Sequence, residues 1–225
     1  MITAVNPMYT KSWFREMQVA GYLVFHETRE DWEEDIAWYL SEGRDYWAEA
    51  RSNLEYYKND LLEFLPEPFH PYIHDGSLGV KFPSTELRAM AKQWKQDYEE
   101  RNRRQMAAYR ANLLAIRDTL PATVVQLCDR PPHDVKVVSF HPPKDGEFSM
   151  ILDGSGNLHP FASPVAQLTF SGVRSWEATD FHEGSVWIYS EVYAKEQGQF
   201  ELHILLDSPL GELTVTAENL EIENL

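Results

Sequence analysis

The chain has almost no cysteine, no long apolar run and no strongly basic stretch, and each absence excludes a class of protein. Cys128 is the only cysteine among 225 residues, so no disulfide can form within the chain, and such usage is typical of a reducing compartment. No apolar run approaches the roughly 20 residues that span a bilayer. The first residues show neither the basic nor the apolar region of a secretory signal. We therefore expect a cytoplasmic protein without a membrane partner.

Motifs that specify a cofactor or a reaction are missing as well. The sequence contains no glycine-rich phosphate loop, no calcium-loop spacing and no nucleophile elbow of the GxSxG type. The arginines of residues 101–104 follow the carboxylates of residues 97–100, so they make no basic stripe for nucleic acid. Asp129 does not favour a catalytic thiolate at its neighbour Cys128. We expect no cofactor and no nucleic-acid partner, and the absence of a catalytic motif weighs against an enzyme without deciding the question.

Acidic residues are in excess, mainly toward the C-terminus. The chain has 36 acidic and 20 basic side chains, a net charge of −16. Residues 1–120 hold 20 acidic and 15 basic residues, a net of −5, whereas residues 121–225 hold 16 and 5, a net of −11. A negative field of this size disfavours nucleic acid and favours a basic protein partner. The charge changes where the hydrophobic period changes, which predicts a helical domain over 1–120 and an acidic β domain over 121–225.

Apolar residues at helical spacing dominate the N-terminal part. They predict a short helix over residues 12–20, a longer one over 31–64 that Gly43 bends or breaks, and a very long one over 84–120. Prolines and glycines between the two long helices predict a returning loop, and therefore an antiparallel helix hairpin. Residues 1–7 resemble an extension, and Met8 is an alternative start.

Short strand-like runs follow residue 130, where we expect no helix longer than one turn. The runs are residues 135–140, 148–152, 166–170, 186–193, 200–206, 213–217 and 220–222. Turn dipeptides separate several of them, namely Asp145-Gly146, Asp153-Gly154, Gln197-Gly198 and Leu210-Gly211. This pattern predicts a mostly antiparallel sheet or small barrel, and the whole chain is expected to be an α+β protein.

Two His-Asp pairs are candidates for chemistry. His70 and His74, with Asp75, have a spacing that suits zinc on a helix. Pro71 and Gly76 predict a loop instead, in which Asp75 caps a turn, and we expect no metal there.

The second pair, His133-Asp134, has the beginnings of a general base but no evident nucleophile. Adjacent side chains on a strand point to opposite faces, which favours a structural role at the start of the first strand.

The run from Trp187 to Tyr193 alternates in character. It is expected to place Trp187, Tyr189, Glu191 and Tyr193 on one face of a strand. An aromatic face with a carboxylate is either a binding surface or half of a core, and the sequence leaves both open. The candidate binding residues are therefore Trp187, Tyr189, Glu191, Tyr193, His74, Asp75, His133 and Asp134.

Several strings together resemble an uncharacterised bacterial family with an N-terminal helical region and a C-terminal β region. They are residues 9–14 (YTKSWF), residues 72–78 (YIHDGSL), His133-Asp134, and the run from residue 190 to 203. The resemblance covers nearly the whole chain from Met8 and departs at Pro132, where the family has an apolar residue. It implies the two-part organisation and no catalytic residues. The acidic C-terminal part is also similar in style to bacterial toxin-immunity proteins.

These observations favour an acidic cytoplasmic protein-binding module, with an immunity-type inhibitor of a basic bacterial toxin as its narrower form. One alternative is a metal-dependent or His-Asp enzyme with a site at the domain junction, built from His74, Asp75, His133 and Asp134. Another is a structural or self-associating protein. The sequence leaves the oligomeric state open.

Overall fold

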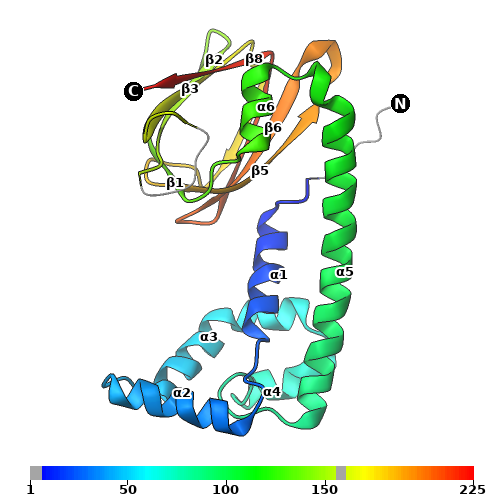
Figure 1. Cartoon of the computed structure of the whole chain (residues 1–225), viewed down its shortest axis with the longest axis vertical. Coiled ribbons are helices and arrows are strands. Elements are labelled where there is room, and N and C mark those ends of the chain that lie inside the picture. Colours follow the sequence, from blue (N-terminus) through cyan, green and yellow to red (C-terminus); the bar gives the residue numbers. More distant parts are fainter. Residues whose placement is uncertain (1–6, 156–160) are drawn as a thin grey trace. The chain divides into compact units, whose positions relative to one another are not determined.

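The computed structural model describes residues 7–155 and 161–225, so the suggested extension falls almost entirely outside the described residues. The chain forms two compact units, each of which is drawn in Figure 1. The helical unit is Ser12–Arg104, and the β unit is Met1–Lys11 with Gln105–Leu225. The chain passes from one unit to the other within α1 (Lys11–Tyr22) and again within α5 (Thr85–Ile116).

This division differs from the boundary expected at residue 120, and it redistributes the charge. The β unit gains residues 1–11 and the end of α5, and then holds 17 acidic and 8 basic residues, a net of −9. The helical unit holds 19 acidic and 12 basic residues, a net of −7. Each unit by itself is therefore strongly acidic.

Glycine and capping residues fix the helices of the helical unit. The expected long helix is broken at Gly43, whose φ of 70° suits glycine, into α2 (Arg29–Ser41) and α3 (Tyr46–Phe64). Thr28 starts α2 with a capping box, and Asp45 caps α3 by accepting a hydrogen bond from Ala48 N. The break that the sequence predicted is therefore confirmed.

The loop expected after α3 is partly helical, so that prediction was wrong. A short 3₁₀ turn (Glu67–Phe69) leads into α4 (His70–His74). Pro71 does not prevent this, because it stands in the first turn of the helix, where its missing N–H has no partner to lose. The long helix α5 follows and ends in a 3₁₀ turn (Arg117–Thr119), close to the predicted end.

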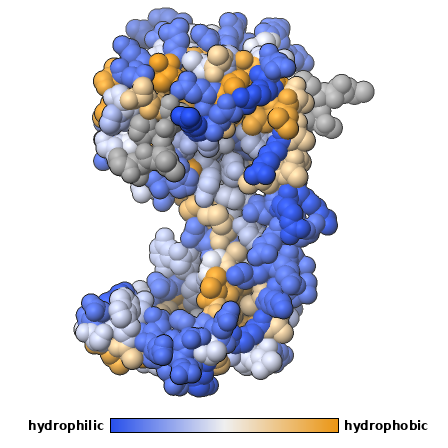
Figure 2. All heavy atoms as spheres, viewed as in Figure 1, coloured by the Kyte–Doolittle hydropathy of each residue, from blue (hydrophilic) through white to orange (hydrophobic). Residues whose placement is uncertain are grey.

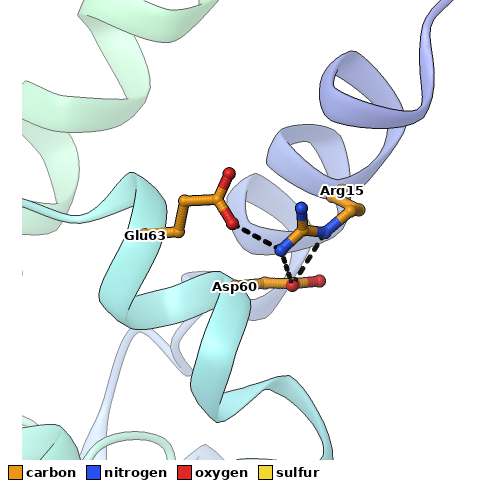
Figure 3. Close-up of polar contacts among 3 residues, drawn as sticks. All are labelled: Arg15, Asp60 and Glu63. Atoms are coloured by element: carbon orange, nitrogen blue, oxygen red, sulfur yellow. Dashed lines mark hydrogen bonds and ion pairs between the residues drawn. The ribbon is translucent and has the colours of Figure 1, made fainter.

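The core of the helical unit is shared by α1, α3, α4 and α5. Its fully buried members include Val19, Leu61, Phe69, Leu78 and Leu87. A polar contact reinforces the packing of α1 on α3: the Arg15 guanidinium donates to Asp60 at 2.6 Å and to Glu63 at 2.5 Å (Figure 3).

The β unit is an eight-stranded sheet in which all neighbours are antiparallel, in the order β4-β7-β6-β5-β1-β2-β3-β8. The strands are β1 (Val135–Lys144), β2 (Glu147–Asp153), β3 (Val165–Ser171), β4 (Ser175–Thr179), β5 (Val186–Ala194), β6 (Phe200–Asp207), β7 (Gly211–Ala217) and β8 (Asn219–Asn224). The α+β class is confirmed. Two elements were not predicted from the sequence, namely β4 and the helix α6 (Ala122–Asp129).

The sheet curls around one apolar core. The ring centroids of Phe170 of β3 and Phe200 of β6 are 6.4 Å apart, and those of Phe148 of β2 and Trp176 of β4 are 6.0 Å apart. Neither pair of strands is adjacent in the sheet. The helix α6 lies against the sheet (Figure 1) and adds Val124 and other apolar side chains to this core. The side chains on the opposite face of β5, β6 and β7 do not belong to this core.

Candidate functional site

A β-bulge in β5 determines which face each candidate residue occupies. Trp187 pairs with Leu206 and Tyr189 with Leu205, so Ile188 is an extra residue in the strand. Trp187 therefore faces the core with 0% exposure, while Tyr189 and the following odd-numbered residues lie on the opposite face. The prediction of one shared face was wrong, because strict alternation does not continue through a bulge.

Glu191 is the buried charge on that opposite face. Its carboxylate is 1% exposed, accepts a hydrogen bond from Tyr9 N at 3.0 Å, and accepts another from the Tyr193 hydroxyl at 2.6 Å. Burying a carboxylate is unfavourable unless donors replace the lost water. Here one donor is the neighbouring side chain on β5, and the other is the main chain of a segment that lies 182 residues earlier.

His203 of β6 lies directly opposite Glu191 in the sheet and binds the same distant residue. Its Nε2 lies 3.0 Å from Tyr9 O, and its Nδ1 lies 3.0 Å from the Thr214 hydroxyl. A carbonyl oxygen only accepts, so Nε2 carries a proton and donates it to Tyr9 O. The N–H and the C=O of Tyr9 are thus both bound by side chains of the sheet.

We call residues 8–11 the anchor segment. Besides Tyr9, Lys11 is bound twice: its N–H donates to Glu212 and its ammonium to Asp180, each at 2.7 Å. The Tyr9 ring stacks on Tyr189 at 5.0 Å between centroids. His203 was not among the residues predicted from the sequence, although a histidine inside the apolar run of β6 is a signal of a buried polar contact.

The pair His133-Asp134 is exposed and lies beside the same face. His133 Nδ1 is 3.0 Å from the Asp134 carboxylate, with side chains 48% and 59% exposed, and the His133 ring meets Tyr189 edge-on at 5.3 Å. The structure therefore brings together the second His-Asp pair and one aromatic candidate. An exposed pair of this kind contributes little stability.

His74 and Asp75 lie in the other unit, and Asp75 caps a turn as the sequence predicts. Asp75 accepts a hydrogen bond from Ser77 N at 2.9 Å, and the Ser77 side chain, followed by this N–H, lowers the pKa of its carboxyl group. His74 is an exposed residue at the end of α4. Within residues 7–155 and 161–225, no three histidine, cysteine or acidic side chains are grouped so as to hold a metal ion.

A cavity of about 280 Å³ lies between β5, α6 and the end of α5. Its lining includes Tyr9, Tyr109, Arg110, Cys128 and Glu191. Burial, and to a smaller extent the charge of Asp129, raises the pKa of the Cys128 thiol to about 11. The thiol is therefore protonated at neutral pH, which disfavours a nucleophilic role. Burial also raises the pKa of Tyr109, so the cavity offers hydrogen bonds and charges rather than an activated nucleophile.

Comparison with known proteins places the chain in a family but gives no activity. No helix of the described part is both long enough and apolar enough to cross a membrane. A search of curated proteins finds no match. Residues 8–217 match one family model, and the match begins at the first residue of the anchor segment. The chain therefore belongs to the family described as "Protein of unknown function (DUF4085)".

Proposed function

We propose that this protein is a protein-binding module whose partner is a basic protein. The observation that carries the proposal is an acidic segment, residues 27–45, which holds eight acidic and two basic residues. Its net charge of −6 accounts for most of the −7 of the helical unit. The charge is therefore concentrated around one helix, α2, instead of being spread evenly.

The same helix offers apolar contacts. No residue of α2 is buried, and Trp38 and Leu40 are 51% and 64% exposed. On the side drawn in Figure 2 the surface of the helical unit is mainly hydrophilic, with smaller apolar areas between the hydrophilic ones. Arg44 lies 4.3 Å from the Tyr39 ring and 5.7 Å from the Trp38 ring, which restrains both aromatic side chains. Aromatic anchors surrounded by charge are typical of binding energy concentrated in a few residues.

The carboxylates of the acidic segment are available to a partner. Among the described residues, no lysine or arginine pairs with Glu30, Glu33 or Glu34. A basic partner supplies the missing cations, and the field of the segment speeds encounter by about 10–10³-fold. The narrower form of the proposal, an immunity-type inhibitor of a basic toxin, rests on this acidity alone.

The test replaces Trp38 with a photo-crosslinking amino acid in the source cells. The captured protein is then purified, and its affinity for the unmodified protein is measured at about 50 mM and about 300 mM salt. We expect a basic protein whose affinity falls at least about tenfold between the two salt concentrations, because screening weakens exposed charge pairs.

A charge-reversed variant and a matched control locate the surface. We expect one triple variant of the acidic segment to bind the partner more weakly than the unmodified protein does, namely Glu30→Lys, Glu33→Lys and Glu34→Lys together. The control is a triple variant of exposed residues on the β unit, which should leave the affinity within about twofold, namely Glu196→Lys, Glu221→Lys and Glu223→Lys. Salt-independent binding, or an equal effect of both triple variants, would overturn the proposal.

A further inference from the structure

Strand β5 has an open edge beside the cavity of the β unit. Only two residue pairs join β1 to β5, at the start of both strands. Further along, Val192 N–H donates to the Tyr109 hydroxyl at 3.1 Å, where a neighbouring strand would otherwise accept it. Backbone direction repeats every two residues, so the N–H and C=O of Ser190 point to the same open edge. Within the described residues, neither of these two groups has a hydrogen-bond partner.

The cavity at this edge carries one charge of each sign. Arg110 is exposed, and it forms no ion pair with a carboxylate in the described part of the chain. Glu191 is the buried carboxylate on the other side of Tyr9. Burial raises the pKa of Tyr9 most, Glu191 raises it further and Arg110 lowers it, so both charges act at the same ring. Both residues line the cavity, and no ion pair joins them in the described part of the chain.

The rest of the lining is largely aliphatic, with Leu113, Leu127 and Leu202 among its members. The volume of about 280 Å³ is close to the lower end of the range of about 300–1,000 Å³ that is typical of small-molecule sites. An aliphatic amino acid is small enough to fit. A polar end with both charges and an apolar remainder is also the chemistry of an aliphatic amino acid.

We propose that this cavity binds a free α-amino acid with an aliphatic side chain. The ligand carboxylate accepts from Arg110 and from Ser190 N–H, and the ligand ammonium donates to Ser190 C=O within the negative field of Glu191. This pairing imitates that of a neighbouring strand. The aliphatic side chain lies among the leucines. The proposal is independent of the acidic segment on the helical unit.

Calorimetric titration of the full-length protein with four compounds tests each part of the ligand. The compounds are L-leucine, 4-methylpentanoate without the ammonium, 3-methylbutylamine without the carboxylate, and glycine without the side chain. We expect leucine to bind at least about tenfold more tightly than the other three, because each lacks one charge-assisted or apolar contact. Failure of leucine to bind at about 10 mM, or equal binding of all four, would overturn the proposal.

Two variants locate the site. Arg110→Gln, an exposed substitution, should weaken leucine binding about tenfold or more and leave 3-methylbutylamine unchanged. Arg103→Gln is the control, since Arg103 is also exposed on α5 but pairs with Glu100. Leucine binding that is the same in wild type and Arg110→Gln would show that the amino acid binds elsewhere and would refute the assignment.

Discussion

The clearest test of the buried hydrogen bonds around Glu191 is the substitution Glu191→Leu. It removes the carboxylate that accepts from two donors, the Tyr9 N–H and the Tyr193 hydroxyl. Each unsatisfied buried donor costs about 1–3 kcal/mol, and loss of the buried charge offsets part of this, so we expect the free energy of unfolding to fall by about 2–4 kcal/mol. Glu191→Gln keeps one acceptor oxygen and should cost about 1–3 kcal/mol.

Urea unfolding followed by circular dichroism measures both changes. Glu196→Leu is the control in the same hairpin, where the side chain is exposed, and it should change the free energy of unfolding by no more than about 0.5 kcal/mol. A double-mutant cycle adds Tyr193→Phe, which removes one of the two donors. In that background Glu191→Leu should cost about 1 kcal/mol less, because one unsatisfied group has disappeared. Additive effects, or equal losses for Glu191→Leu and Glu196→Leu, would refute the reasoning.

Three further predictions concern other parts of the chain. Gly211→Ala should destabilise the β unit by about 2 kcal/mol or more in urea unfolding, because a Cβ there would lie 2.7 Å from two backbone oxygens at the end of β4. The control is Gly21→Ala, whose Cβ meets no atom within 4 Å, so this substitution should be neutral or stabilising. The thiol of Cys128 should react with a disulfide reagent at pH 7 at least about tenfold more slowly in the folded than in the unfolded protein, since its pKa is raised to about 11. Burial raises the pKa values of Tyr22 and Tyr109, so the folded protein keeps protons that the unfolded chain releases near pH 10. The stability that these protons contribute is complete below pH 10, and above it the free energy of unfolding should fall by at most about 1.4 kcal/mol per pH unit for each tyrosine. Urea unfolding between pH 9 and about pH 11 measures the change. A flat pH profile, a fast thiol reaction or a harmless Gly211→Ala would each contradict its prediction.

The strands and the helix break were predictable from local signals. Alternation and turn dipeptides mark most strands, and Gly43 marks the end of α2, because these features depend on residues close in sequence. The bulge at Ile188 was not predictable in this way. Its position depends on the pairing of β5 with β6, which a single strand does not reveal. The prediction that Trp187 shares a face with Tyr189 was wrong for that reason.

The hydrogen bonds of Glu191 and His203 with Tyr9 join residues that are far apart in sequence. Glu191 was singled out because of its aromatic neighbours, and one of them, Tyr193 of β5, does donate to it, but the other donor is the Tyr9 N–H of the anchor segment. Helix α6 was missed because it is only eight residues long, follows a proline and has apolar residues that also suit a strand. Tertiary packing, and not local propensity, determines such short elements.

The long separation between Tyr9 and Glu191 also has a consequence during synthesis. Ribosomes add about 5–20 residues per second, so a separation of 182 residues corresponds to roughly 10–40 s between the appearance of the two partners. The anchor segment therefore leaves the ribosome long before its docking face exists. The β unit can complete its structure only when the last strands have emerged, whereas the residues of the helical unit are all available earlier.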